Sequence, residues 1–147
     1  MCTGDPKATI TQLQLEELVR VAQEASKAAY NPYSKFSVGC ALLCKSGKIY
    51  TGSNIENASF SVTICAERVA ASQAIHRDDR DWLAMTVVSP SRVTPCGVCR
   101  QFLSEFSPHL PIWIGYLQGG DLTGPMLVSQ MLPFAMTLSP SQESNLS

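Results

Sequence analysis

Four side chains that could carry chemistry lie at the expected starts of two helices. Cys65 lies two residues before Glu67 in the stretch TICAER, and Cys96 and Cys99 are three residues apart in PCGVC. Side chains at positions i and i+3 of a helix point to the same side. The free N–H groups and the helix dipole at a helix N-terminus favour thiolates, the form of cysteine that binds metals. The pattern predicts one metal site built from three cysteines.

The number of candidate ligands indicates a catalytic zinc ion. Catalytic zinc keeps one open position beside three protein ligands, whereas structural zinc takes four. Glu67 follows Cys65 too closely to bind the same ion, but it is well placed to accept a proton from water in the open position. Zinc with three thiolates carries net negative charge, and we expect Arg68 to offset it by hydrogen bonding to the thiolates. The alternative for Arg68 is an ordinary surface arginine.

Other interpretations of the cysteines remain open. PCGVC also resembles a thioredoxin-like redox motif. A structural zinc could recruit His76 or His109 as its fourth ligand, and a zinc-binding module without catalysis would need no Glu67. The Cys-Ala-Glu triplet upstream favours catalysis, because a redox dithiol needs neither a third cysteine nor a glutamate.

Hydrophobic spacing predicts an α/β domain that brings the two cysteine-bearing helix starts together. One helix is expected from Thr11 to about Tyr30, with Thr11 and Gln14 as a capping box, followed by a helix from Cys65 to His76 and another from Cys96. The order of elements indicates a two-layer or three-layer α/β domain with a mixed sheet. Right-handed crossovers would place the last two helices side by side on one face of that sheet. The expected strands are 36–43, 48–54, 82–89, 110–117 and 122–128. The last strand contains a proline, which indicates an edge position.

Length and composition limit the class of protein. The 147 residues fit one domain, 1–147, in which about 1–10 and 138–147 are expected to be flexible tails. A net charge of −1 with 16% charged residues offers no basic surface for nucleic acid. No apolar run reaches the roughly 20 residues of a membrane span, and no signal segment opens the chain, so we expect a cytoplasmic protein without membrane partners. Few charges among 45% apolar residues indicate self-association.

Several motifs in order resemble the small homotetrameric, zinc-dependent cytidine deaminases of pyrimidine salvage. The pair Cys-Ala-Glu and Pro-Cys-x-x-Cys is the zinc deaminase signature in its three-cysteine form. The stretches that carry the resemblance are NPYSKFSVGCALL, GSNIENASF, TICAER and PCGVCRQFLSEF, within residues 12–134. The resemblance implies a three-layer α/β/α fold with a central mixed five-stranded sheet. It also implies hydrolysis of cytidine and deoxycytidine to uridine and deoxyuridine plus ammonia.

The resemblance also implies roles for individual residues. Glu67 is expected to shuttle protons from water to ring N3 and to the leaving amino group, beside one zinc ion per subunit. Asn54 and Glu56, which project to one side of an extended chain, are expected to bind the sugar. The base would contact Phe36 and the backbone N–H of Ala66. The zinc ligands implied are Cys65, Cys96 and Cys99.

Two departures from the family pattern concern the loops around the substrate. Phe60 is followed by Ser61, where the family usually has proline or glycine. The family's Leu-Pro-x-x-Phe near the C-terminus is replaced by Leu-Pro-Phe-Ala-Met, so Phe134 is the expected aromatic cover of a neighbouring subunit's base, with Met136 as the alternative. A related deaminase of a nucleoside antibiotic shares the zinc motifs but is distinguished by the sugar-binding stretch NIEN. A nucleotide or polynucleotide deaminase would need basic groups for phosphate.

Overall fold

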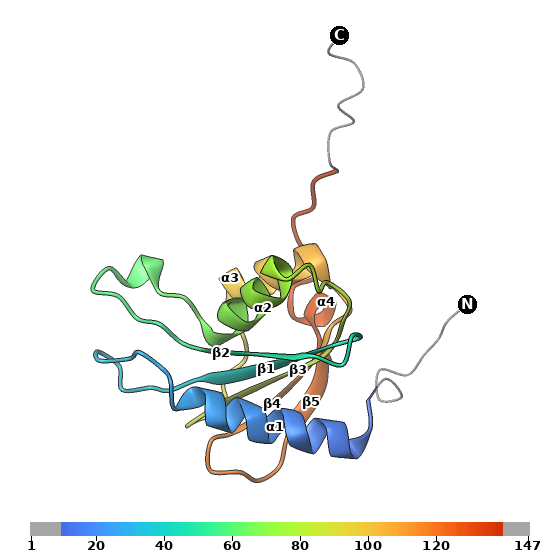
Figure 1. The fold of residues 1–147 in the computed structure, drawn as a ribbon. Coiled ribbons are helices and arrows are strands. Elements are labelled where there is room, and N and C mark those ends of the chain that lie inside the picture. Colours follow the sequence, from blue (N-terminus) through green and yellow to red (C-terminus); the bar gives the residue numbers. More distant parts are fainter. Residues whose placement is uncertain (1–9, 140–147) are drawn as a thin grey trace.

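A mixed five-stranded sheet forms the centre of the molecule (Figure 1). The computed structural model describes residues 10–139, so nearly all of both expected tails lies outside the described residues. The strand order is β2-β1-β3-β4-β5, in which β3 and β4 are parallel and the other neighbours antiparallel. The strands are β1 Gly39–Cys44, β2 Ile49–Ser53, β3 Trp82–Ser89, β4 Pro111–Tyr116 and β5 Thr123–Leu127. The strand with the proline lies at the sheet edge, as predicted.

Helices cover both faces of the sheet, which confirms the three-layer α/β/α expectation (Figure 1). Helix α1 packs on one face over β1 and β3, and α2 and α3 lie together on the other face. Buried apolar residues fill both interfaces. The sequence did not predict the short helix α4 or the 3-10 turn η2. The helices are α1 Gln12–Ser26, η2 Phe60–Val62, α2 Ala66–His76, α3 Gly97–Phe106 and α4 Val128–Met131.

Helix α1 begins as predicted and ends earlier than predicted. Thr11 and Gln14 form the capping box, which is confirmed. The expected end near Tyr30 is wrong, because the helix stops at Ser26. The Tyr30 N–H donates to the Asn54 carbonyl at 2.9 Å, and the Glu56 N–H donates to the Tyr30 carbonyl at 2.7 Å. An isolated bridge to residues that are distant in the sequence therefore replaces the last helical turn.

The first turn of α2 lies directly against the sheet because of a glycine in β2. A Cβ atom on Gly52 would lie 2.2 Å from the Ala66 carbonyl oxygen and 2.6 Å from the Ala70 nitrogen. Any side chain at this position would push the helix start away from the sheet. Since that helix start carries Cys65 and Glu67, Gly52 sets the depth at which both residues sit.

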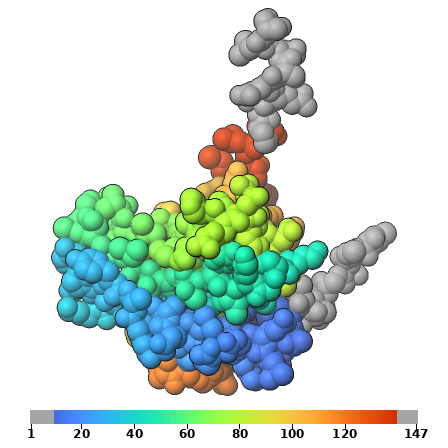
Figure 2. Space-filling model, viewed as in Figure 1, coloured from blue at the N-terminus to red at the C-terminus, as the bar shows by residue number. Residues whose placement is uncertain are grey.

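Two loops meet at one end of the sheet and expose aromatic side chains. In Figure 2 the light blue surface of residues 30–36 adjoins the green surface of residues 57–62. The rings of Tyr33 and Phe60 approach to 5.8 Å between centroids, and both are at least half exposed. Among residues 10–139, no helix combines the length and apolar character needed to cross a membrane.

Candidate active site

The starts of α2 and α3 bring three cysteine sulfurs together. Cys65 is the N-cap of α2, Cys96 is the N-cap of α3, and Cys99 lies in the first turn of α3. Their sulfur atoms all lie within 4.8 Å of one another, and those of Cys65 and Cys96 are 3.7 Å apart. Two sulfurs bound to one tetrahedral zinc at about 2.3 Å would lie about 3.8 Å apart. The spacing of the thiols therefore fits zinc.

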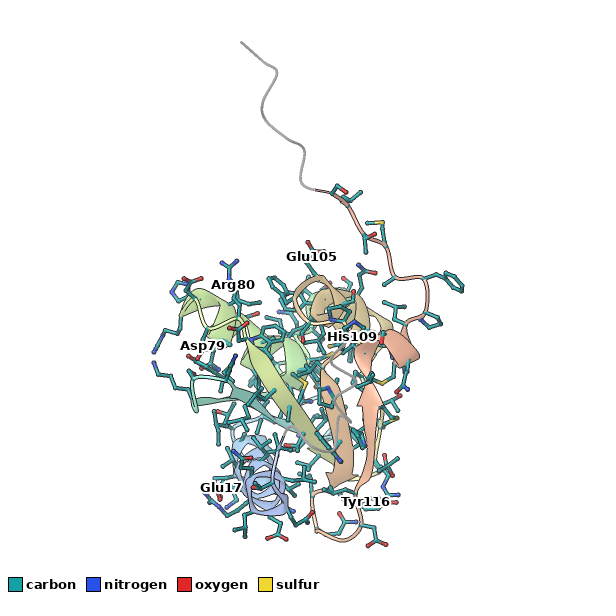
Figure 3. All side chains as sticks on the ribbon, turned by 90° about the vertical axis from the view of Figure 1, so that its right-hand side faces the viewer. Glu17, Asp79, Arg80, Glu105, His109 and Tyr116 are labelled. Atoms are coloured by element: carbon teal, nitrogen blue, oxygen red, sulfur yellow. The ribbon has the colours of Figure 1, made fainter. Side chains whose placement is uncertain are left out.

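The histidines considered as a fourth ligand are not part of this cluster. Among the residues that the structure describes, the three cysteines are the only close group of three or more His, Cys, Asp or Glu side chains. His76 and His109 are both exposed. His109 follows the C-terminal end of α3 (Figure 3), whereas the thiols of Cys96 and Cys99 lie at the start of that helix. Neither histidine is positioned to complete a four-ligand site.

Arg68 places its guanidinium against two of the three sulfurs. Its Nε donates to Cys99 Sγ at 3.4 Å, and one terminal nitrogen donates to Cys65 Sγ at 3.5 Å. The same terminal nitrogen donates to the Thr63 carbonyl at 3.1 Å, which holds the guanidinium in place. The neighbouring Cys99 thiol, together with Arg68, lowers the pKa of Cys65 to about 5 despite its burial. The site therefore stabilises a thiolate before any metal binds.

Glu67 is buried beside the thiols, with only 4% of its surface exposed. Burial raises the pKa of its carboxyl group. Oε2 accepts a hydrogen bond from Cys99 Sγ at 3.1 Å. Metal binding requires the cysteines to lose their protons, so it would remove this donor and free Oε2 to accept a proton from water. The arrangement suits a proton carrier that adjoins the ligands and is not one of them.

Glu56 is held by a turn in the preceding loop. Its Oε2 accepts the Tyr33 N–H at 2.9 Å, and its carboxylate also accepts the backbone N–H and the hydroxyl of Ser34. The hydrogen bond from the Ser34 hydroxyl is the main cause that lowers the pKa of Glu56. The side chain is only 6% exposed, and these hydrogen bonds outweigh the cost of burial, so the carboxylate is ordered and ionised at neutral pH. Sequence reasoning missed Ser34, whose only signal is its place in a turn 22 residues away.

Asn54 directly follows β2 and contacts the same loop near the start of β1. Its Oδ1 accepts the Val38 N–H at 2.9 Å, and its Nδ2 donates to the Phe36 carbonyl at 2.8 Å. Phe36 is half-buried in this loop. Ala66 is the first residue of α2, where backbone N–H groups have no partner within the helix. The Ala66 N–H, between Cys65 and Glu67, therefore has no partner within the helix.

The expected aromatic cover does not touch this chain's own site. Phe134 is fully exposed at 104% and Met136 is 67% exposed. Both follow α4 in a segment that rises away from the sheet beyond the end of α3 (Figure 1). Within the described chain, therefore, the thiols and Glu67 have no aromatic cover from this segment.

Comparison with known proteins gives one consistent result. The family model for the cytidine and deoxycytidylate deaminase zinc-binding region matches residues 12–112. A cytidine deaminase from Halalkalibacterium halodurans is 45% identical over 123 residues, which are 82% of this chain and 92% of that protein. The crystal structure of cytidine deaminase from Burkholderia pseudomallei has a TM-score of 0.79 at 36% identity and covers 86% of this chain and all of that one. A blasticidin-S deaminase from Bacillus cereus is 34% identical, covering 87% of this chain and 95% of that protein.

Proposed function

Because the chain belongs to the zinc-dependent cytidine and deoxycytidylate deaminase family, we propose that it hydrolyses cytidine and deoxycytidine to uridine and deoxyuridine, releasing ammonia. One observation carries the proposal: three thiols spaced for zinc adjoin a buried glutamate that is not a ligand. A redox dithiol would need no such glutamate, and a structural zinc would need a fourth ligand.

Zinc held by Cys65, Cys96 and Cys99 would supply a Lewis acid that lowers the pKa of water and so makes a nucleophile available at neutral pH. Glu67 takes a proton from the attacking water and delivers it to ring N3 as C4 is attacked. It then takes the remaining proton of that water from the oxygen now bound to C4 and passes it to the amino group, which leaves as ammonia while the C4 carbonyl forms. Burial raises the pKa of the Glu67 carboxyl group above its usual value, which favours its holding a proton between these successive transfers.

Arg68 supports this chemistry by holding the ligands. Its hydrogen bonds to two of the sulfurs place a positive charge against the anionic thiolates. Withdrawal of electron density from the sulfurs would keep the zinc acidic enough to activate water.

We assign the sugar and the base to residues of the chain next to this site, where a bridge pairs Ile55 with Ile64, the residue before Cys65. Asn54 and Glu56 offer an amide and a carboxylate for sugar hydroxyls, and both are held by hydrogen bonds that order the 33–38 loop. The Ala66 N–H is free to donate to the pyrimidine carbonyl oxygen. Phe36 supplies an apolar contact for the base.

A side-by-side assay tests the proposed function. Ammonia release should be measured with cytidine, deoxycytidine, CMP, a cytosine-containing oligonucleotide and blasticidin S. We expect turnover of the two nucleosides to exceed that of every other substrate. Faster turnover of blasticidin S would favour the antibiotic deaminases, to which the chain is also similar. No ammonia from any substrate would refute a deaminase.

Replacement of Glu56 by glutamine should narrow the preference for cytidine over CMP. The buried carboxylate is ionised at neutral pH, so it accepts sugar hydroxyls strongly and repels a phosphate. We expect kcat/KM for cytidine to fall about tenfold to a hundredfold, since a charged hydrogen bond contributes ~1.5–3 kcal/mol. Activity on CMP should fall less, and zinc content should not change.

The matched control is Glu105→Gln, which neutralises an exposed carboxylate at the far end of α3 (Figure 3). This variant should leave both substrates unaffected. Equal losses for cytidine and CMP in Glu56→Gln would contradict the role of Glu56 in the sugar site.

We also propose that four copies of the chain associate and complete one another's sites. The segment with Phe134 and Met136 leaves its own site uncovered, and aromatic side chains such as Tyr33 and Phe60 are exposed. An obligate interface of this kind should bury more than ~2,000 Å². Sedimentation at low protein concentration, combined with activity measurement, tests the assembly. A fully active monomer would disprove it.

A further inference from the structure

Two neighbouring side chains of α3 form hydrogen bonds to the segment 131–136, which carries Phe134. Arg100 donates from one terminal nitrogen to the Met131 carbonyl at 2.7 Å. Gln101 donates from Nε2 to the Met136 carbonyl at 3.0 Å. The two acceptors lie on either side of Phe134, so both ends of segment 131–136 are tied to the same helix.

The segment between the two anchors holds Phe134 outward. The residue has a φ of 58°, in the left-handed region that a phenylalanine rarely adopts. Its ring is fully exposed and gains no packing energy within the chain. An unfavourable backbone conformation and an unburied ring persist only where surrounding contacts impose them. The anchors at Met131 and Met136 are such contacts.

Arg100 connects this segment to the zinc ligands of its own chain. Its Nε donates to the Pro95 carbonyl at 2.7 Å, and its other terminal nitrogen donates to Thr94 Oγ1 at 3.0 Å. Pro95 directly precedes the ligand Cys96, and Arg100 directly follows the ligand Cys99. One guanidinium therefore joins the loop before the metal site to the base of the exposed segment.

We propose that Arg100 and Gln101 are positioning residues that hold Phe134 in place to cover the pyrimidine in a neighbouring subunit. The inference rests on the proposed function and on the assembly proposed above. Fixing the segment before substrate arrives lowers the entropy lost when the ring closes over the base. Arg100 and Gln101 lie on α3, the helix that also bears Cys99. The position of Phe134 is therefore coupled to the position of the zinc ligands in its own chain.

Gln101 gives the sharper test because it makes a single anchoring contact. Gln101→Ala should raise KM for cytidine about threefold to tenfold, the effect of one neutral hydrogen bond, with kcat and zinc content unchanged. Phe134→Ala should raise KM at least as much. In the double variant, the loss of Gln101 should add nothing, because a positioning residue acts only through the residue that it positions.

Gln73→Ala is the matched control. Gln73 also donates from Nε2 to a backbone carbonyl, that of Thr51, at 2.7 Å, but it lies on α2 away from the segment. It should leave KM unchanged. If Gln101→Ala raised KM equally in the wild-type and Phe134→Ala backgrounds, its role would be structural and the proposal would be wrong. If Phe134→Ala left KM unchanged while cytidine was still deaminated, the cover itself would be refuted.

Hydrogen exchange gives a readout that does not depend on activity. Peptides spanning residues 129–139 should exchange faster in Gln101→Ala and Arg100→Lys than in the wild-type protein, whereas peptides of β3 should not change. Equal exchange of the segment in all variants would show that the two side chains do not anchor it and would overturn the proposal. A wild-type protein that failed to deaminate cytidine would refute the proposed function, and Phe134 as its cover, even if exchange showed the anchors.

Discussion

Glu67→Gln is expected to abolish nearly all turnover while zinc content and fold remain unchanged. Glutamine keeps the size and the acceptor oxygen of the side chain but cannot carry a proton. One general acid–base contribution is worth ~10²–10⁴ in rate, and Glu67 is assigned more than one proton transfer, so the loss should exceed that range. Because the side chain is buried, a carboxylate from the solvent cannot reach this position to carry the proton in its place.

The measurement pairs single-turnover kinetics on cytidine with metal analysis of the same sample. Glu105→Gln, at an exposed position, should retain normal rates. Retention of most activity by Glu67→Gln would exclude Glu67 as the proton shuttle. If Glu67→Gln lost zinc in proportion to its loss of activity, the result would show that Glu67 helps to bind the metal.

Cys99→Ala is expected to lose both zinc and activity. Cys99 is buried, and its sulfur is close to both other thiols and accepts a hydrogen bond from Arg68. Two remaining thiols are too few for the three-ligand catalytic site. Zinc affinity should therefore fall by more than the ~10–100-fold typical of losing a group that only supports a ligand.

The control is Cys44→Ala, which removes a buried cysteine of β1 that does not belong to the cluster. This variant should keep its zinc, as measured by metal analysis after dialysis against a weak chelator. Zinc should also raise the Tm of the wild-type protein and of Cys44→Ala, because a ligand that binds the folded state stabilises it. An equal zinc-dependent rise in Tm for Cys99→Ala would contradict its role as a ligand.

The sequence alone determined the features that depend on neighbouring residues. The capping box of Thr11 and Gln14 spans one helical turn, so it could be recognised directly. The same holds for the cysteines at helix starts: spacing within one turn decides which side chains share a side. The mixed α/β sheet followed from the order of helices and strands, since few topologies satisfy the connection rules. The three-layer arrangement was implied by the resemblance to the family. The motifs also indicated the family, which the comparisons confirmed.

Only the tertiary structure decided contacts between residues that are distant in the chain. Whether Arg68 faced solvent or the thiols depended on how α2 packs beside α3, and spacing alone could not distinguish the two. The end of α1 was missed because pairing between Tyr30 and residues 54–56 overrides local helix preference. The hydrogen bond of Ser34 to Glu56 and the exposed position of Phe134 also depend on contacts between residues that are distant in the chain. These arrangements depend on long-range packing and hydrogen bonds, for which a local pattern carries no signal.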